Sequence, residues 1–210
     1  MGRMNTHLAH DMRTPLQLIY SCAQMIETEL NDPGQPASRY AKILMENVQS
    51  LKDMLACELD CATGSGDIVQ AVRSLCRRMD AEAVRSGVIL LFSSNAASFR
   101  MRLDQGKLDR ILQNLISNAL RFTPPGGSVR TDLRILGDTV EISVSDTGPG
   151  ITPERRKRIF EPGETSGGYG LGLGIARKLA RQMGGRLELD PRYENGASFI
   201  LRLPVKGATR

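Results

Sequence analysis

Apolar residues recur in alternating steps of three and four over the first part of the chain. One such run covers residues 4 to 30 and a second covers residues 38 to 60. This spacing predicts two amphipathic helices, because steps of three and four place side chains on one helical face. Pro15 lies inside the first run and is expected to bend that helix, since proline removes one intrahelical hydrogen bond. The polar segment between the runs predicts a loop, and therefore an antiparallel helical hairpin.

A single hairpin cannot bury both apolar stripes, whereas two hairpins can pack as a four-helix bundle. We therefore expect a homodimer in which residues 1 to 61 form the dimerisation domain. The sequence CATGSGD at residues 61 to 67 is rich in small and polar residues and is expected to be a linker. Residues 67 to 206 are expected to form a second domain.

The pattern alternates between helical and strand spacing in this second part of the chain. Helices are predicted at 68–86, 104–122, 153–160 and 171–183. Strands are predicted at 88–93, 98–103, 128–136, 139–145, 185–190 and 197–203, with hairpin turns at Gly137-Asp138 and Asn195-Gly196. Helices on one face of a mostly antiparallel sheet make an α/β sandwich of the α+β class.

Composition excludes several functional classes. The 210 residues carry a net charge of +5, but the basic residues are scattered and only 4% of residues are aromatic, so we expect no nucleic-acid binding. The four cysteines show neither CxxC pairs nor zinc-binding spacing, which indicates packing in a reducing compartment. No run of eighteen apolar residues and no signal peptide occur. The chain is thus expected to be cytoplasmic, without direct membrane contact.

Polar residues share one face of the helix predicted at 104–122. Asn114 and Asn118 are four residues apart, and Arg121 follows three residues later. The Asn118 amide oxygen suits Mg²⁺, which prefers oxygen ligands. The Arg121 guanidinium suits a bidentate contact with phosphate. Taken alone, a polar, solvated helix face explains the same residues.

The sequence DTGPGI follows the strand predicted at 139–145. Asp146 ends that strand, and its carboxylate is able to accept a hydrogen bond from the exocyclic amine of adenine. Gly148 and Gly150 permit positive φ and a close approach of the backbone to a flat ligand. A tight turn without a ligand explains this motif equally well.

The segment GYGLGLGIARKLA is a glycine-rich loop that runs into a helix. Gly168, Gly170 and Gly172 leave backbone amides free to approach phosphate, and the helix N-terminus adds partial positive charge. The spacing matches neither a Walker motif nor a dinucleotide-binding fingerprint. A flexible loop remains the alternative interpretation of this segment.

His10 is followed directly by Asp11 on the first predicted helix. A neutral imidazole is a competent nucleophile, and the neighbouring carboxylate is able to fix its tautomer and take a proton. Thr14 lies four residues after His10, on the same face, where its hydroxyl is able to orient a water molecule. The alternative is a solvent-facing helix histidine. That alternative applies to His7, which has no adjacent carboxylate.

The four signals of the second domain, in this order, resemble the GHKL ATPase domain of sensor histidine kinases. NLISNALRFTP is similar to the asparagine box, DTGPGI to the first glycine box, RIFEP to the phenylalanine box and GYGLGLG to the second glycine box. The resemblance implies ATP and Mg²⁺ as ligands. By this resemblance Asn118, with Asn114 beside it, would bind Mg²⁺, and Arg121 would contact phosphate. Phe122 would line the base pocket and Asp146 would form a hydrogen bond with adenine. The other residues implied to contact ATP are Gly148, Gly150, Gly168, Gly170, Leu171 and Gly172. Residues 161 to 170 would be a lid, shorter than is usual in the family.

HDMRTPL resembles the H-box of the HisKA phosphotransfer domain. The resemblance implies that His10 is phosphorylated, that Asp11 is its acid/base partner and that Thr14 acts in regulator dephosphorylation. It implies a response-regulator receiver domain as partner and a sensor domain upstream of this chain, in a parent protein that could be membrane-anchored. Since the sequence starts shortly before His10, we expect either an excised core or a short kinase that receives its signal from a partner. A GHKL ATPase without phosphohistidine and a kinase-dead dimeric scaffold are the rival hypotheses.

Overall fold

The computed structural model describes residues 16, 19–21, 48, 64–161 and 171–205. Residues 16, 19–21 and 48 are helical. The remainder of the predicted hairpin, together with His10, Asp11 and Thr14, lies outside the described residues. From residue 64 onward the described residues, 171 and 172 aside, belong to one compact unit.

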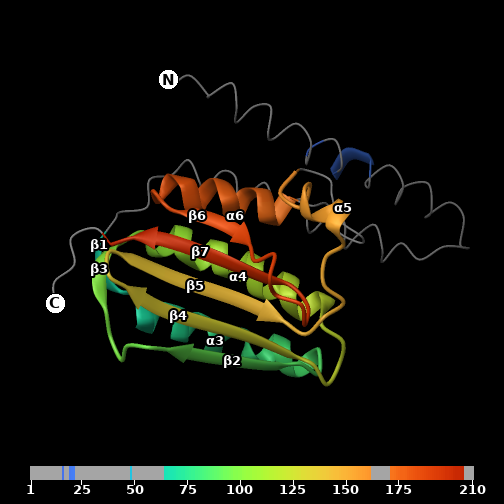
Figure 1. Cartoon of the computed structure of the whole chain (residues 1–210), viewed down its shortest axis with the longest axis horizontal. Coiled ribbons are helices and arrows are strands. Elements are labelled where there is room, and N and C mark those ends of the chain that lie inside the picture. Colours follow the sequence, from blue (N-terminus) through green and yellow to red (C-terminus); the bar gives the residue numbers. More distant parts are fainter. Residues whose placement is uncertain (1–15, 17–18, 22–47, 49–63, 162–170, 206–210) are drawn as a thin grey trace, which may run out of the picture. The chain divides into compact units, whose positions relative to one another are not determined.

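A five-stranded sheet forms the framework of this unit (Figure 1). Its strands, in spatial order, are β2 (Ile89–Ser94), β4 (Ser128–Leu136), β5 (Thr139–Asp146), β7 (Ser198–Pro204) and β6 (Arg186–Leu189). Within this sheet only β2 and β4 run parallel, so the prediction of a mostly antiparallel sheet is confirmed. A separate two-stranded sheet pairs β1 (Gly64–Asp67) with β3 (Arg100–Leu103).

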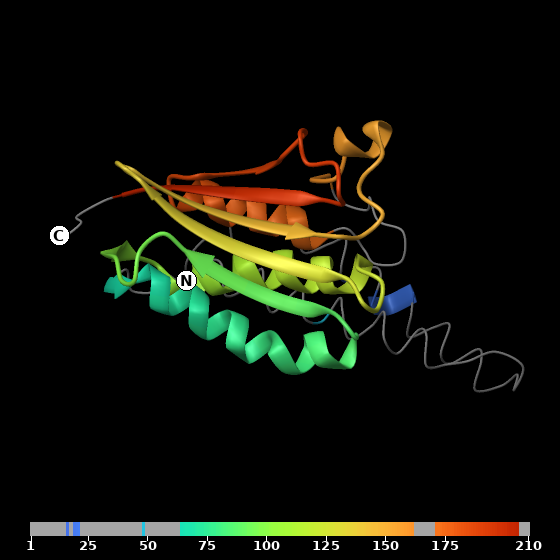
Figure 2. The same cartoon turned by 60° about the horizontal axis from the view of Figure 1, so that its bottom comes forward.

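Three long helices cover one face of the five-stranded sheet (Figures 1 and 2). They are α3 (Ile68–Arg85), α4 (Gln105–Phe122) and α6 (Leu171–Gln182), and a short helix α5 (Pro153–Arg156) precedes α6. Along β5 every second residue is buried, namely Val140, Ile142, Val144 and Asp146. This alternation buries one face of the strand against the helices. The predicted α/β sandwich is therefore the fold of this unit.

Both ends of α4 are fixed by polar side chains. Asp104 caps the start, where its carboxylate accepts a hydrogen bond from the Lys107 amide at 3.0 Å. At the other end, the Thr123 hydroxyl donates to the Ala119 carbonyl at 2.7 Å, and two prolines follow in the sequence. Proline cannot continue a helix, so α4 ends at Phe122, just before these two prolines.

Two predicted boundaries were wrong. Residues 64–67, expected within a linker, form β1, because their backbone pairs with β3 from Gly64↔Leu103 to Asp67↔Arg100. The helix predicted over 153–160 ends at Arg156, and the residues after it form turns. Cys76 is buried on α3, as expected for a packing cysteine. Within the part of the chain that the structure describes, no helix combines the length and apolar character needed to span a bilayer.

Candidate functional site

Asp146 ends β5 with its carboxylate held by the backbone. Its side chain is buried, with 6% of the residue exposed, and its Oδ1 accepts hydrogen bonds from the amides of Gly148 at 2.9 Å and Ala197 at 3.1 Å. Among the described residues no hydrogen bond reaches Oδ2. Burial raises the pKa of Asp146, and the two amide hydrogen bonds oppose that rise. The geometry thus fixes one oxygen of the carboxyl group and leaves the other without a described partner.

The glycines of DTGPG allow three backbone segments to meet beside Asp146. A Cβ at Gly148 would lie 2.8 Å from the carbonyl oxygen of Phe122, the last residue of α4. Gly150 has φ of +72°, and a Cβ there would lie 3.0 Å from the carbonyl oxygen of Gly196. Gly148 therefore has no room for a side chain, and a side chain at Gly150 would be strained by the positive φ and crowded by that carbonyl. The loop after β5 therefore packs between the end of α4 and the turn before β7.

Thr147 ties this loop to the start of β4. Its hydroxyl accepts a hydrogen bond from the Ser128 amide at 2.9 Å, and its own amide donates to the Ser128 carbonyl at 3.1 Å. Thr147, Gly196 and Ala197 were not predicted as site residues from the sequence. The Asn195-Gly196 pair predicts only a hairpin turn, although that signal marks the right position.

The polar residues of α4 lie at and before its C-terminal end. Asn114 and Asn118 are partly buried, and the Nδ2 atom of Asn114 is buried without a hydrogen-bond partner among the described residues. The guanidinium of Arg121 lies over the Phe122 ring, 5.5 Å from its centre, and both side chains are exposed. The carbonyl oxygen of Phe122 lies beside Gly148. No described contact joins the two asparagines to Asp146.

The predicted glycine-rich loop is only partly described. Gly168 and Gly170 lie outside the described residues, whereas Leu171 and Gly172 begin α6 where the helix was predicted to start. The first four amides of a helix have no acceptor within it. Because the first turn of α6 contains no acidic residue, its amides and partial positive charge favour an anion.

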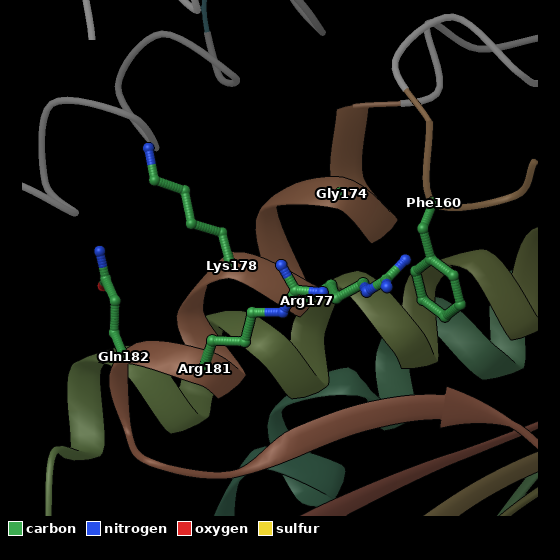
Figure 3. Close-up of a pocket in the computed structure, with 6 residues that line it drawn as sticks. All are labelled: Phe160, Gly174, Arg177, Lys178, Arg181 and Gln182. Carbon is green, nitrogen blue, oxygen red and sulfur yellow. The ribbon is translucent and has the colours of Figure 1, made fainter. Parts of the chain in front are cut away.

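A cationic cavity of about 550 Å³ opens on the outer face of α6 (Figure 3). Its lining consists of Phe160, Gly174, Arg177, Lys178, Arg181 and Gln182. The guanidinium of Arg177 lies 4.9 Å from the centre of the Phe160 ring, and that ring contacts Phe199 edge-on at 6.2 Å. The opposite face of α6 is buried through Ile175, Ala176, Leu179 and Ala180. The cavity is therefore separate from Asp146, which does not line it.

The described residues contain no group of three acidic, histidine or cysteine side chains able to hold a metal ion by themselves. A cation at Asn118 would therefore need further oxygen ligands from a bound phosphate and from water. This donor set fits Mg²⁺, which usually keeps several waters and binds through few protein ligands.

Residues 103–207 match the family model described as histidine kinase-, DNA gyrase B- and HSP90-like ATPase. Histidine protein kinase DivJ of Caulobacter vibrioides is 30% identical, over 97% of this chain and 37% of DivJ. The signal transduction histidine-protein kinase/phosphatase MprB of Mycolicibacterium paratuberculosis is 31% identical, over 97% of this chain and 43% of MprB. The chain thus spans less than half the length of these relatives.

Two solved structures of histidine kinases are also similar to this chain. The catalytic domain of histidine kinase ThkA is 27% identical with a TM-score of 0.64, covering 69% of this chain and 99% of that domain. Full-length ShkA, crystallised in complex with AMPPNP, is 27% identical with a TM-score of 0.70, covering 97% of this chain and 46% of ShkA.

Proposed function

Since this chain belongs to the histidine kinase-, DNA gyrase B- and HSP90-like ATPase family, we propose that it is the catalytic core of a sensor histidine kinase. ATP would bind in the second domain and phosphorylate His10 in the first. The phosphoryl group would then pass to an aspartate of a response-regulator receiver domain. The relatives that are similar along almost the entire chain carry the names of histidine kinases, which supports this reaction over ATP hydrolysis alone.

The Asp146 carboxylate is the observation that carries the proposal. One oxygen is held by two backbone amides, and the other has no partner among the described residues. A carboxylate oxygen without a donor suits the exocyclic amine of adenine, because the amine supplies the missing donor. Gly148 and Gly150 let the loop pack against the carbonyl groups of Phe122 and Gly196 beside this carboxylate.

The phosphate end would lie between α4 and α6. Asn118 would hold Mg²⁺, which supplies charge neutralisation for the transferred phosphoryl group. Arg121 would contact phosphate, Phe122 would border the base, and Gly168, Gly170, Leu171 and Gly172 would offer backbone amides. The unpartnered Nδ2 of Asn114 supports a polar ligand next to this helix, because a buried amide without a partner is costly.

The acceptor half of the proposal concerns residues 1 to 61, as a dimeric helical hairpin. His10 would attack the γ-phosphorus as a neutral imidazole and displace ADP, and Asp11 would orient the ring and take its proton. Thr14 would orient water when the regulator is dephosphorylated, and the name of the relative MprB likewise pairs kinase with phosphatase. Leu16 and Tyr20 are 50% and 66% exposed in the single chain, which supports a partner hairpin that covers them.

Incubation with γ-³²P-labelled MgATP tests the proposal. We expect protein-bound label that is labile in acid and stable in alkali, as a phosphoramidate is. His10→Gln should abolish this label. His7→Gln is the matched control, because it removes the other of the two histidines, and it should leave the label intact.

The rival functions give different products in the same experiment. An ATPase without phosphohistidine would release free phosphate, and would continue to do so after His10→Gln. A kinase-dead scaffold would give neither product while still binding a receiver domain. Either result would overturn the kinase proposal. Mixing His10→Gln with Asn118→Ala would show whether phosphorylation crosses the dimer, because only transfer between subunits restores the label.

A further inference from the structure

The turn between β6 and β7 approaches Asp146 more closely than a side chain would allow. Gly196 is buried and has φ of +152°. A Cβ at this position would collide with the carbonyl oxygen of Asp146 and lie 2.8 Å from its Oδ1. Position 196 therefore requires glycine both for its backbone conformation and for lack of space.

Ala197 holds both the backbone and the side chain of Asp146. Its amide donates to Oδ1 at 3.1 Å, and its carbonyl oxygen accepts from the Asp146 amide at 2.9 Å. The side chain of Ala197 has no polar atom, so this contribution comes from its backbone alone. These two hydrogen bonds join residues that are 51 positions apart, and they depend on the pairing of β5 with β7.

The same turn supports the far end of the DTGPG loop. A Cβ at Gly150 would lie 3.0 Å from the carbonyl oxygen of Gly196, so the two backbone segments are in close contact. Oδ1 also accepts the Gly148 amide, so two chain segments fix one oxygen from two directions. The remaining oxygen of the carboxylate is then fixed in direction as well, because the carboxyl group is planar and rigid.

We propose that Gly196 and Ala197 are positioning residues for base recognition, which act through Asp146 and set the preference for adenine over guanine. The inference rests on the proposed ATP binding. Adenine carries an amine donor where guanine carries a carbonyl acceptor. A carboxylate oxygen fixed opposite this atom attracts the amine and repels the carbonyl, whereas a carboxylate free to turn away discriminates less.

Calorimetric titration of the full chain with AMP-PNP and GMP-PNP, both with Mg²⁺, tests this role. The wild-type chain should prefer AMP-PNP. Gly196→Ala should weaken AMP-PNP binding by about 10- to 100-fold, as expected for loss of a hydrogen bond to a charged group, and should reduce the adenine preference. Gly137→Ala is the matched control, because Gly137 also has positive φ, of +60°, but has open space around it in the β4–β5 turn. It should keep both affinity and preference.

A double variant shows whether Gly196 acts through Asp146. In the Asp146→Asn background, Gly196→Ala should change the AMP-PNP to GMP-PNP ratio little further. An unchanged ratio in the single Gly196→Ala variant would overturn the positioning role while ATP binding stands. Failure of the wild-type chain to bind AMP-PNP would instead overturn the proposed function, and this inference with it.

A measurement on the wild-type chain covers the case in which Gly196→Ala does not fold. The amide proton shifts of Gly148 and Ala197 should follow one common titration, that of the Asp146 carboxyl, in NMR spectra. AMP-PNP should move this titration to lower pH, because a donated hydrogen bond stabilises the charged form, and GMP-PNP should not. Separate titrations of the two amides, or equal effects of both nucleotides, would overturn the inference.

Discussion

Asp146 is a buried carboxylate and Asp109 a partly buried one, and their surroundings are opposite. Burial raises the pKa of each. Asp109 lies on α4 and pairs with Arg78 of α3 at 2.8 Å through Oδ2, while its Oδ1 is buried without a partner among the described residues. Asp146 is held by neutral backbone amides instead, through one oxygen, and has no cation in its described hydrogen bonds.

The difference separates a candidate site from a structural ion pair. Arg78 neutralises Asp109, and the free oxygen of Asp109 is closed off from any ligand. The amides around Asp146 fix its direction without cancelling its charge. A raised pKa alone therefore does not identify a functional carboxylate, because burial produces it in both places. What distinguishes Asp146 is the source of its hydrogen bonds and the state of its second oxygen.

Asp146→Asn should produce the largest effect on nucleotide binding. Asparagine keeps the shape of the side chain, but its amide group would face the adenine amine with a donor if its oxygen stays on the backbone amides. We expect AMP-PNP binding to weaken by about 10- to 100-fold, measured by calorimetry. Asp109→Asn is the matched control and should bind within about twofold of the wild-type chain, a shift small beside that of a charged hydrogen bond. Equal losses in both variants would remove the distinction between the two carboxylates.

Acidification should reproduce part of that loss in the wild-type chain. Protonation removes the charged acceptor of Asp146, and its raised pKa places this protonation above the pH of an ordinary aspartate. AMP-PNP affinity should therefore fall as pH decreases, already above the usual aspartate range, and Asp146→Asn should flatten this dependence. Titrations at successive pH values measure it. A dependence that persists in Asp146→Asn would assign it to another group.

The raised pKa of Asp146 affects folding stability in the opposite direction to nucleotide affinity. The folded state binds the Asp146 proton more tightly than the unfolded chain does, so the folded state gains stability as pH falls through the window between the two pKa values and loses it as pH rises. Asp109 contributes in the same direction. Thermal unfolding followed between the ordinary aspartate pKa and neutrality measures the sum. Asp109→Asn should reduce the slope without altering nucleotide binding.

Arg78→Ala should affect stability alone. It leaves the partly buried Asp109 without its cation, but Arg78 is half exposed, so solvent screens much of the interaction. We expect the free energy of unfolding to fall by about 1 kcal/mol and Tm by about 2–4 °C. Arg186→Ala is the control, since Arg186 forms an exposed pair with Glu188 and should change Tm less. A loss of AMP-PNP affinity in Arg78→Ala would contradict the structural role of this pair.

The sequence predicted local features of the site well. The 3.6-residue pattern located α4, and the alternation from 139 onward located β5, so Asp146 was expected at a strand end followed by glycines. Asp67 and Asp104 cap α3 and α4 close to the predicted starts of these helices. Such features depend on residues within a few positions of one another, which a single sequence displays directly.

Features that depend on distant pairing were not predictable. The role of Gly196 follows from the register that places Ser145 opposite Ser198, and the sequence does not state which strands are neighbours. The strand at 64–67 is similar, because GSGD lacks strand character and gains it only by pairing with β3. His10, Asp11, Thr14 and the hairpin around them stay predictions, as do the binding roles of all the predicted site residues.

Asn114→Leu should give the smallest change in the free energy of unfolding. It extends the comparison to two unpartnered polar atoms on α4. The Nδ2 of Asn114 and the Oδ1 of Asp109 are both buried without described partners. Replacing Asn114 with an apolar residue of similar size removes an unpartnered donor, so the free energy of unfolding should rise by about 0.5 kcal/mol. Gln113→Leu, at an exposed position on the same helix, is the control for helix propensity. If Asn114→Leu also weakens AMP-PNP binding, its polar atom serves a ligand, as Asp146 is proposed to do. If binding is unchanged, Asn114 belongs with Asp109, because the same lack of a partner then has only a structural cost.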